Sequence, residues 1–175
     1  MVTWFSLIFT FVIFQRIIEL NLARKNALKA KALGGYEIGQ EHYPLIVIMH
    51  VAFLLSLAVE TVIRGHYRLP PVFAFLTIFL LAQVLRIWVI ISLGKMWNTR
   101  IILIPESKPV TWGPYRYLKH PNYLVVVLEF ITLPLSFGAL WTALFFSILN
   151  LAILKRRIKI EEAGLKQLPT FKDYF

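Results

Sequence analysis

Long apolar blocks are the feature of this sequence that most restricts its fold. Several of them run for about twenty residues with few charges, the length that a helix needs to cross a hydrocarbon layer of roughly 30 Å. Hydrophobic residues make up 58% of the 175 residues, the mean hydropathy is +0.69, and only 16% of the residues are charged. A soluble globular chain carries roughly a quarter of charged residues. Because lipid offers no hydrogen-bond partners to the backbone, the sequence predicts an all-α integral membrane protein.

The blocks predict about five transmembrane helices in a single membrane-embedded domain over residues 1–175. The expected spans are residues 2–23, 43–63, 71–93, 122–133 and 140–160. Pro134 and Gly138 separate the last two blocks, and the shorter block is too brief for a comfortable perpendicular crossing. We therefore expect the last two helices to form a tight hairpin with Pro134 at or near its tip.

Basic residues set the expected orientation in the membrane. Apart from Arg16 and Arg86, lysines and arginines fall in the first connector, in the stretch 95–119 and in the C-terminal tail, whereas the loops on the other side hold Arg64 and Arg68. The positive-inside rule then puts the N-terminus outside and all three basic regions in the cytoplasm. Under this topology the stretch 113–123 and the C-terminal tail meet at the cytoplasmic face.

Several function classes do not fit the sequence. The net charge of +10 does not indicate nucleic-acid binding, because the basic residues lie in separate loops rather than in a soluble basic domain. The absence of cysteine excludes disulfides, thiolate metal sites and a cysteine nucleophile. The four histidines are scattered and lack His-Glu-x-x-His spacing, so no metal site is expected. The sequence also lacks a Gly-x-Ser-x-Gly nucleophile and a Walker loop.

A polar and aromatic stretch before the fourth apolar block, residues 113–123, is the main candidate for a functional site. It reads GPYRYLKHPNY. His120 offers a neutral donor and acceptor near pH 7, and Pro121 keeps the backbone before it extended. A helix starting near Asn122 would present free N–H groups to an anionic ligand, while Tyr115 and Tyr123 would supply stacking faces and hydroxyls. These residues alone predict a polar ligand site at a membrane interface.

Charged residues within or near the apolar blocks are further candidates. Arg157 and Glu161 are four residues apart and share one helical face, a spacing that an ordinary surface ion pair also produces. Arg16 and Glu19, near the end of the first block, are interpreted as snorkelling or a local ion pair. Arg86 lies inside a span, where a charge is costly, so it is a candidate for substrate binding; a structural pairing explains it about equally well.

Taken together, the motifs resemble the isoprenylcysteine carboxyl methyltransferase (ICMT) family, and in particular its small bacterial-type integral membrane O-methyltransferases. The resemblance rests on Val-Thr-x-Gly-x-Tyr at 110–115, Lys-His-Pro-Asn-Tyr at 119–123 and Arg-x-x-x-Glu-Glu-x-x-Leu at 157–165. A helical hairpin separates the second motif from the third. Lys119 stands where the family usually has an arginine. The motifs cover the C-terminal third of the chain.

The resemblance implies a methyltransferase that uses S-adenosyl-L-methionine, held in a pocket on the cytosolic side. It assigns cofactor binding to residues within 110–123 and 157–165, namely Val110, Tyr115, His120, Pro121, Asn122, Tyr123 and Glu161. Arg157 would be the catalytic residue and face the reacting group of the substrate. Because an arginine stays protonated, it would orient an anionic oxygen by charge-assisted hydrogen bonds rather than act as a base.

The expected reaction is O-methylation of a lipophilic molecule with a carboxylate or an acidic hydroxyl, such as an alkylpyrone or a prenylcysteine. N-methylation of phospholipid amines is an alternative, although Arg157 suits a nitrogen nucleophile poorly. Two further alternatives are a nicotinamide-cofactor site of the sterol-reductase kind and a non-enzymatic membrane scaffold whose basic loops hold anionic lipid.

Overall fold

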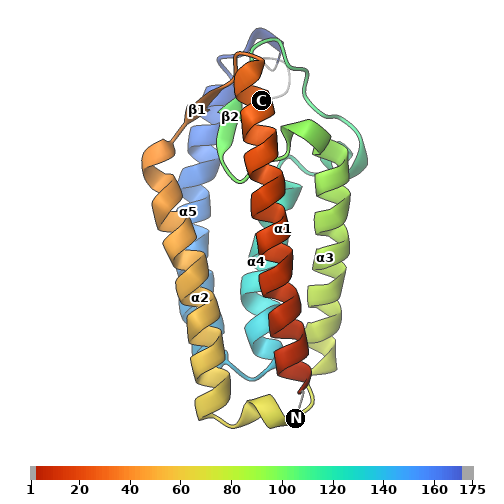
Figure 1. The fold of residues 1–175 in the computed structure, drawn as a ribbon, viewed down its shortest axis with the longest axis vertical. Helices are drawn as coiled ribbons and strands as arrows, with labels where there is room; N and C mark the ends of the chain where they lie inside the picture. The colour runs from red at the N-terminus through yellow and green to blue at the C-terminus, as the bar shows by residue number, and fades with distance from the viewer. Residues whose placement is uncertain (1–2, 171–175) are drawn as a thin grey trace.

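The computed structural model describes residues 3–170, which form a helical bundle with a small sheet at one end (Figure 1). The helices in this part of the chain are α1 (Trp4–Ala32), α2 (Tyr43–Ile63), α3 (Phe73–Leu93), α4 (Pro121–Ser136) and α5 (Leu140–Leu165). The strands are β1 (Tyr36–Ile38) and β2 (Ile101–Leu103). The expected start of the first span, at position 2, lies outside the described residues.

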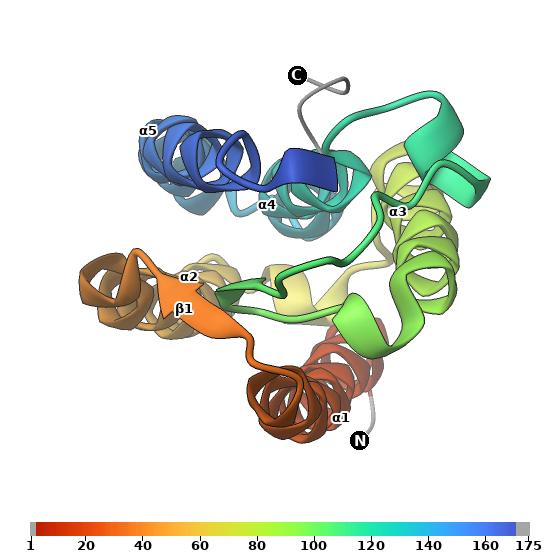
Figure 2. The ribbon, with the colours of Figure 1, turned by 90° about the horizontal axis from the view of Figure 1, so that it is seen from above.

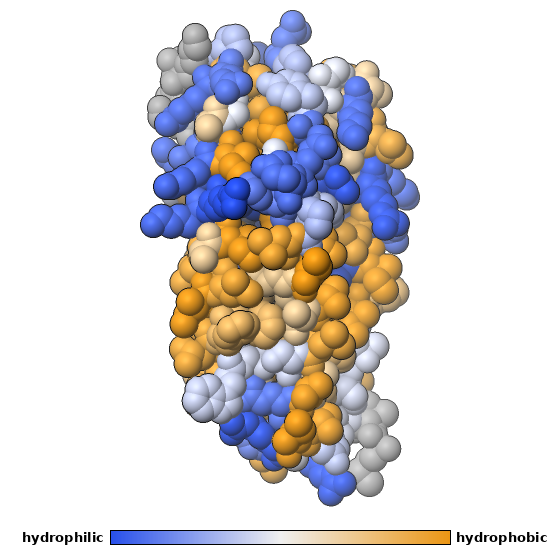
Figure 3. Space-filling model, turned by 90° about the vertical axis from the view of Figure 1, so that its left-hand side faces the viewer, coloured by the Kyte–Doolittle hydropathy of each residue, from blue (hydrophilic) through white to orange (hydrophobic). Residues whose placement is uncertain are grey.

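The helices have the length and composition of a membrane protein. Three of them, α1, α2 and α3, are long and apolar enough to cross a bilayer, whereas α4 is apolar but has 16 residues. The 26-residue α5 is apolar in its first half and charged in its second. On the face drawn in Figure 3, an apolar band lies across the middle of the molecule with hydrophilic regions on both sides. These features confirm the expected all-helical membrane architecture.

The first helix continues beyond the span expected for it. Residues 24–32 read RKNALKAKA, mostly strong helix formers, and the helix ends at Ala32, with Leu33 as its C-cap before Gly34, which has φ +78°. Asn26 is buried and fixes this extension, because its amide donates to the carbonyls of Gly94 at 3.1 Å and of Trp97 at 2.8 Å. The basic half of α1 is therefore anchored to the turn that follows α3.

The last two helices form the expected hairpin. Pro134 lies in the last turn of α4, and the chain reverses through Gly138, which has φ +68°. A side chain at this glycine would collide with His66. Glu60 at the end of α2 then caps α5, because its carboxylate accepts from the backbone N–H of Trp141 at 3.1 Å and of Thr142 at 2.7 Å.

Removing this cap is expected to destabilise the hairpin. Glu60→Ala leaves two N–H groups at the start of α5 without an acceptor, so the free energy of unfolding should fall by about 1–2 kcal/mol. Denaturant unfolding in detergent measures the change. Arg64→Ala is the control, because Arg64 only pairs with Glu60 at a partly exposed position and should cost less than about 0.5 kcal/mol. Equal effects of the two variants would contradict the capping role.

The helices pack in an order that differs from their order in the chain. Figure 2 shows α3, α4 and α5 along one side of the bundle, with α1 and α2 opposite them. Backbone contacts are closest between α4 and its neighbours α3 and α5, and α2 packs on α5. Phe53 of α2 stacks on Phe130 of α4 with ring centroids 4.2 Å apart, at the centre of the apolar core. Helix α1 joins the apolar core through Phe5 and Val12 and is also held by polar contacts.

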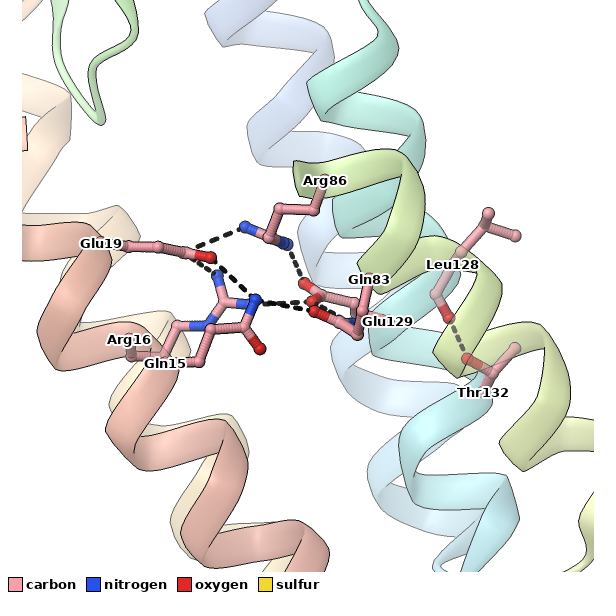
Figure 4. A network of polar contacts seen from close by, with 8 residues as sticks. All are labelled: Gln15, Arg16, Glu19, Gln83, Arg86, Leu128, Glu129 and Thr132. Carbon is pink, nitrogen blue, oxygen red and sulfur yellow. Dashed lines mark hydrogen bonds and ion pairs between the residues drawn. The ribbon is translucent and has the colours of Figure 1, made fainter. Parts of the chain in front are cut away.

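Four charged side chains supply those contacts inside the bundle (Figure 4). Arg16 lies 2.7 Å from Glu19 and 2.8 Å from Glu129, which confirms the expected local pair and adds a partner on α4. Arg86 of α3 bonds to the same two carboxylates, and Gln83 donates to Glu129 at 2.7 Å. Two arginines thus face two glutamates, and their charges balance within this network, hereafter the ion network.

The two strands close the end of the bundle where the candidate motifs lie. They pair antiparallel with Tyr36 opposite Leu103 and Ile38 opposite Ile101. The sheet presses against the end of α5 at Gly164, where any side chain would collide with Ile38 and Leu103. The connector after α1 is thereby brought beside the segment that follows α3.

Candidate active site

A cavity of about 120 Å³ lies where the ends of α3, α4 and α5 meet β2; we call it the polar cavity. The sequence motifs that are far apart in the chain converge here. Six of the residues predicted from the sequence line the cavity: Tyr115, His120, Asn122, Tyr123, Arg157 and Glu161. The imidazole of His120 and the carboxylate of Glu161 are therefore at the same end of the bundle, as the sequence interpretation requires.

A tight turn positions Tyr115 in the polar cavity. Residues Gly113–Arg116 form a single helical turn that packs on α3, and Gly113 has φ +63°. A side chain at Gly113 would collide with Ser92 of α3, so only glycine allows this close approach. Burial, together with the nearby Glu161 carboxylate, raises the pKa of the Tyr115 hydroxyl. Tyr115 therefore stays protonated and available as a hydrogen-bond donor.

The start of α4 positions His120. Pro121 is the buried first residue of the helix, where its missing N–H costs nothing, and it does not itself line the cavity. The His120 ring stacks on Tyr123 with centroids 5.3 Å apart, and its Nε2 lies 3.0 Å from Glu162. The hydrogen bond with His120 lowers the pKa of the Glu162 carboxyl, so this carboxylate is ionised and holds the imidazole in place.

Tyr123 stands between Arg157 and Glu161. Its hydroxyl accepts a hydrogen bond from Arg157 Nε at 3.0 Å and donates one to the Glu161 carboxylate. Arg157 Nη2 also donates to the carbonyl of Thr99 at 2.7 Å, and Nη1 has no hydrogen-bond partner within residues 3–170. The two charged residues thus do not form the simple surface ion pair that their spacing would also allow. One hydroxyl links them, and the guanidinium keeps a free donor.

A second, larger cavity of about 220 Å³ adjoins the first; we call it the apolar cavity. The exposed surface of its wall is mostly apolar and includes aliphatic side chains from α1, α2, α4 and α5, and the ion network contributes Arg16, Glu19 and Arg86. Five residues line both cavities: Trp97, Asn98, Asn122, Tyr123 and Arg157. The Arg157 guanidinium, with its unpartnered Nη1 donor, therefore belongs to a wall shared by a polar and an apolar chamber.

Three residues predicted for the site do not line the polar cavity. Pro121 begins α4, and Val110 is half-buried in the preceding loop and lines neither cavity. Arg86 is 3% exposed, belongs to the ion network and contributes to the wall of the apolar cavity. Its pairing with two glutamates is the structural explanation that the sequence left open, and substrate binding by Arg86 stays a prediction.

Other lining residues were not singled out from the sequence. Trp97, Asn98 and Arg100 line the polar cavity together with β2. Their position could have indicated a role in the site, because they directly follow the third span, at the same membrane face as the motifs. Asn150 lines the apolar cavity, and it could have been noticed in the sequence as a single amide within an apolar run.

The fold defines a helical membrane protein with two adjoining cavities, one of which lies at the end of the bundle that carries the motifs. Sequence comparison places the chain among such proteins: residues 75–167 match the model of the isoprenylcysteine carboxyl methyltransferase (ICMT) family, and the chain belongs to that family. The matched segment runs from α3 to the end of α5 and contains every residue of the polar cavity. The resemblance seen in the motifs is confirmed, and membership supports a membrane methyltransferase activity in general.

Two relatives match over most of the chain. The uncharacterized protein YpbQ of Bacillus subtilis (strain 168) is 39% identical over 163 residues, which cover 93% of this chain and 97% of the relative. An uncharacterized protein of Haemophilus influenzae (strain ATCC 51907 / DSM 11121 / KW20 / Rd) is 30% identical over 152 residues, covering 86% and 87%. No solved structure matches the chain significantly.

Proposed function

We propose that this protein is an S-adenosylmethionine-dependent O-methyltransferase that acts on a lipophilic substrate with a carboxylate or an acidic hydroxyl. The observation that carries the proposal is the position of Arg157 and Tyr123 on the wall shared by the polar and apolar cavities. A cofactor in the first chamber and a lipid in the second would meet at this wall. Alkylpyrones and prenylcysteines are the substrates with the required chemistry that we would test first.

The polar cavity has groups that suit the cofactor. Glu161 supplies a negative charge for a cation, and Tyr115 supplies a protonated hydroxyl and an aromatic face. Asn122 Oδ1 and Trp97 Nε1 are buried and have no hydrogen-bond partner in the described part of the chain. An acceptor and a donor are thus left for a ligand with both kinds of group. His120, Tyr123 and the start of α4 complete the expected binding surface.

Methyl transfer from this cofactor needs positioning more than it needs a protein nucleophile. When bound, S-adenosylmethionine would supply an activated methyl group, whose carbon would bond to the substrate oxygen as its bond to sulfur breaks in line and the neutral thioether leaves. Arg157 would hold the anionic oxygen of the substrate with its free guanidinium donor, and it remains protonated throughout. Tyr123 would fix the guanidinium from one side, as it does through the bond to Arg157 Nε. The apolar wall would exclude water from the reacting atoms.

We also propose an orientation of the protein in the membrane. The polar cavity lies at the end of the bundle that carries the first connector and the end of α5, and both are rich in lysine and arginine. By the positive-inside rule, this end would face the cytoplasm, where the cofactor is made, and the N-terminus would lie outside.

Cofactor binding is the first test. Calorimetry on the detergent-solubilised protein should detect binding of S-adenosylmethionine. Glu161→Gln should weaken this binding about 10- to 100-fold, because a charge-assisted contact worth about 1.5–3 kcal/mol is lost. Glu41→Gln is the matched control: it removes the same charge from an exposed carboxylate that lines neither cavity. No binding by the wild type, or equal weakening by both variants, would contradict the assignment. Tighter binding of NADPH would favour the reductase alternative instead.

Methyl transfer from labelled S-adenosylmethionine is the second test. Purified protein should label at least one of a panel of alkylpyrones, phenolic lipids and prenylcysteines. Labelling of phosphatidylethanolamine alone would favour the N-methyltransferase alternative, and a failure to label any lipid would favour a scaffold.

A further inference from the structure

Unpartnered polar atoms gather around the apolar cavity. Nine buried side-chain atoms in the described part of the chain have no hydrogen-bond partner, and five of them belong to residues that line this cavity. Arg86 contributes one atom and Asn150 both atoms of its amide, and Trp97 and Asn122, which also line the polar cavity, contribute one atom each. Unpartnered groups of this kind are rare in folded proteins and call for a specific explanation.

Asn150 is the strongest of these cases. It lies in the middle of α5, is 1% exposed and leaves both Nδ2 and Oδ1 without a partner. Within a bilayer no bulk water reaches such a group, so an unpaired amide costs more there than at a protein surface. A leucine would fill the same space without that cost. A ligand in the cavity that accepts a hydrogen bond from Nδ2 or donates one to Oδ1 would remove the cost of the unpaired amide.

The position of Asn150 relative to Arg157 gives the ligand a length. The two residues are seven positions apart on α5, which is two helical turns or about 10 Å along the axis, and both line the apolar cavity. The ligand's group at Asn150 should be neutral, because the ion network beside the cavity already balances its own charges.

We propose that Asn150 is a specificity-determining residue that binds a neutral hydroxyl or keto group in the chain of the substrate, about 10 Å from the oxygen that is methylated. The inference rests on the proposed function only in placing that oxygen at Arg157. It narrows the substrate class to lipids with an acidic group at one end and a hydrogen-bonding group near mid-chain. A plain alkyl or prenyl chain would leave the amide unpaired and would bind less tightly.

Binding of matched fatty acids to the full chain in detergent, without S-adenosylmethionine, tests the inference. The probes are stearic acid, 10-hydroxystearic acid and 10-oxostearic acid, whose carboxylate can reach Arg157 while the substituent lies near mid-chain. Calorimetry on the wild type should give a dissociation constant about tenfold lower for at least one substituted acid than for stearic acid. Tighter binding of 10-hydroxystearic acid would indicate that Asn150 binds a hydroxyl group, and tighter binding of 10-oxostearic acid would indicate a keto group.

Two variants separate recognition from a structural role. Asn150→Leu should bind all three acids alike and should unfold at a higher temperature than the wild type, because an unpaired amide has been removed. Ser147→Ala is the matched control: it removes another unpartnered polar atom from α5, but Ser147 does not line the cavity, so the tenfold preference should persist.

The inference is overturned if the wild type binds the three acids equally or binds none of them. It is also overturned if Asn150→Leu keeps the preference or unfolds at a lower temperature. These outcomes do not involve methyl transfer. A protein that methylates lipids but shows no preference would refute this inference alone, whereas one that shows the preference but fails to bind S-adenosylmethionine would refute the proposed function alone.

Discussion

Arg157→Ala is expected to lower kcat/KM for methyl transfer about 100- to 1,000-fold, the loss typical when one preorganised donor to a reacting oxygen is removed. The guanidinium lies on the shared wall of the two cavities, held by Tyr123 and by the carbonyl of Thr99, and has a free Nη1 donor. Arg157→Lys should recover little activity, because an ammonium cannot bond to both of these partners and the substrate in the same geometry. Initial rates with labelled cofactor measure the effect.

Arg156→Ala is the matched control for this experiment. It removes the neighbouring arginine, which is exposed and lines neither the polar nor the apolar cavity, so its rate should stay close to that of the wild type. If Arg157→Ala keeps more than a tenth of the wild-type rate, Arg157 does not orient the reacting oxygen.

Glu129→Leu is expected to cause the largest loss of stability, about 3–5 kcal/mol in the free energy of unfolding. The carboxylate is buried and bonds to Arg16, Arg86 and Gln83, so the substitution leaves the buried Arg86 and the half-buried Arg16 with one glutamate. The effect should be largest on α1, because Arg16 and Glu19 of the ion network join that helix to α4 and α3. Unfolding in mixed detergent micelles measures the loss.

Two further variants test the origin of that loss. Gln83→Leu removes a neutral donor to the same carboxylate and should cost only about 1 kcal/mol. The double variant Arg86→Met, Glu129→Leu removes one charge of each sign and should regain much of the stability lost by Glu129→Leu alone. A loss below about 1 kcal/mol for Glu129→Leu would show that the network contributes little to folding.

The sequence predicts the helices well because hydropathy and chain breakers act locally. Pro134 and Gly138 predicted the hairpin, and the apolar blocks predicted both ends of every helix except α1 to within about five residues. The end of α1 was harder to predict, because its extension to Ala32 depends on Asn26 binding carbonyls that follow α3. That contact joins residues about seventy positions apart, so no local sequence pattern predicts it.

The candidate site was predictable from motifs but its connections were not. The spacing of Arg157 and Glu161 showed that they share a helical face, yet it could not show that the Tyr123 hydroxyl stands between them. Similarly, Arg86 was recognised as a costly buried charge, whereas its partners Glu19 and Glu129 come from two other helices. Such partners depend on how the helices pack, which one sequence does not specify.

The pairing of β1 with β2 has a mechanical consequence for access to the site. β1 belongs to the connector between α1 and α2, and β2 forms part of the wall of the polar cavity. If the two helices moved apart, they would pull the connector, and the hydrogen-bonded strands would carry that displacement to the wall of the polar cavity. Filling one compartment would then reshape the other through the paired strands.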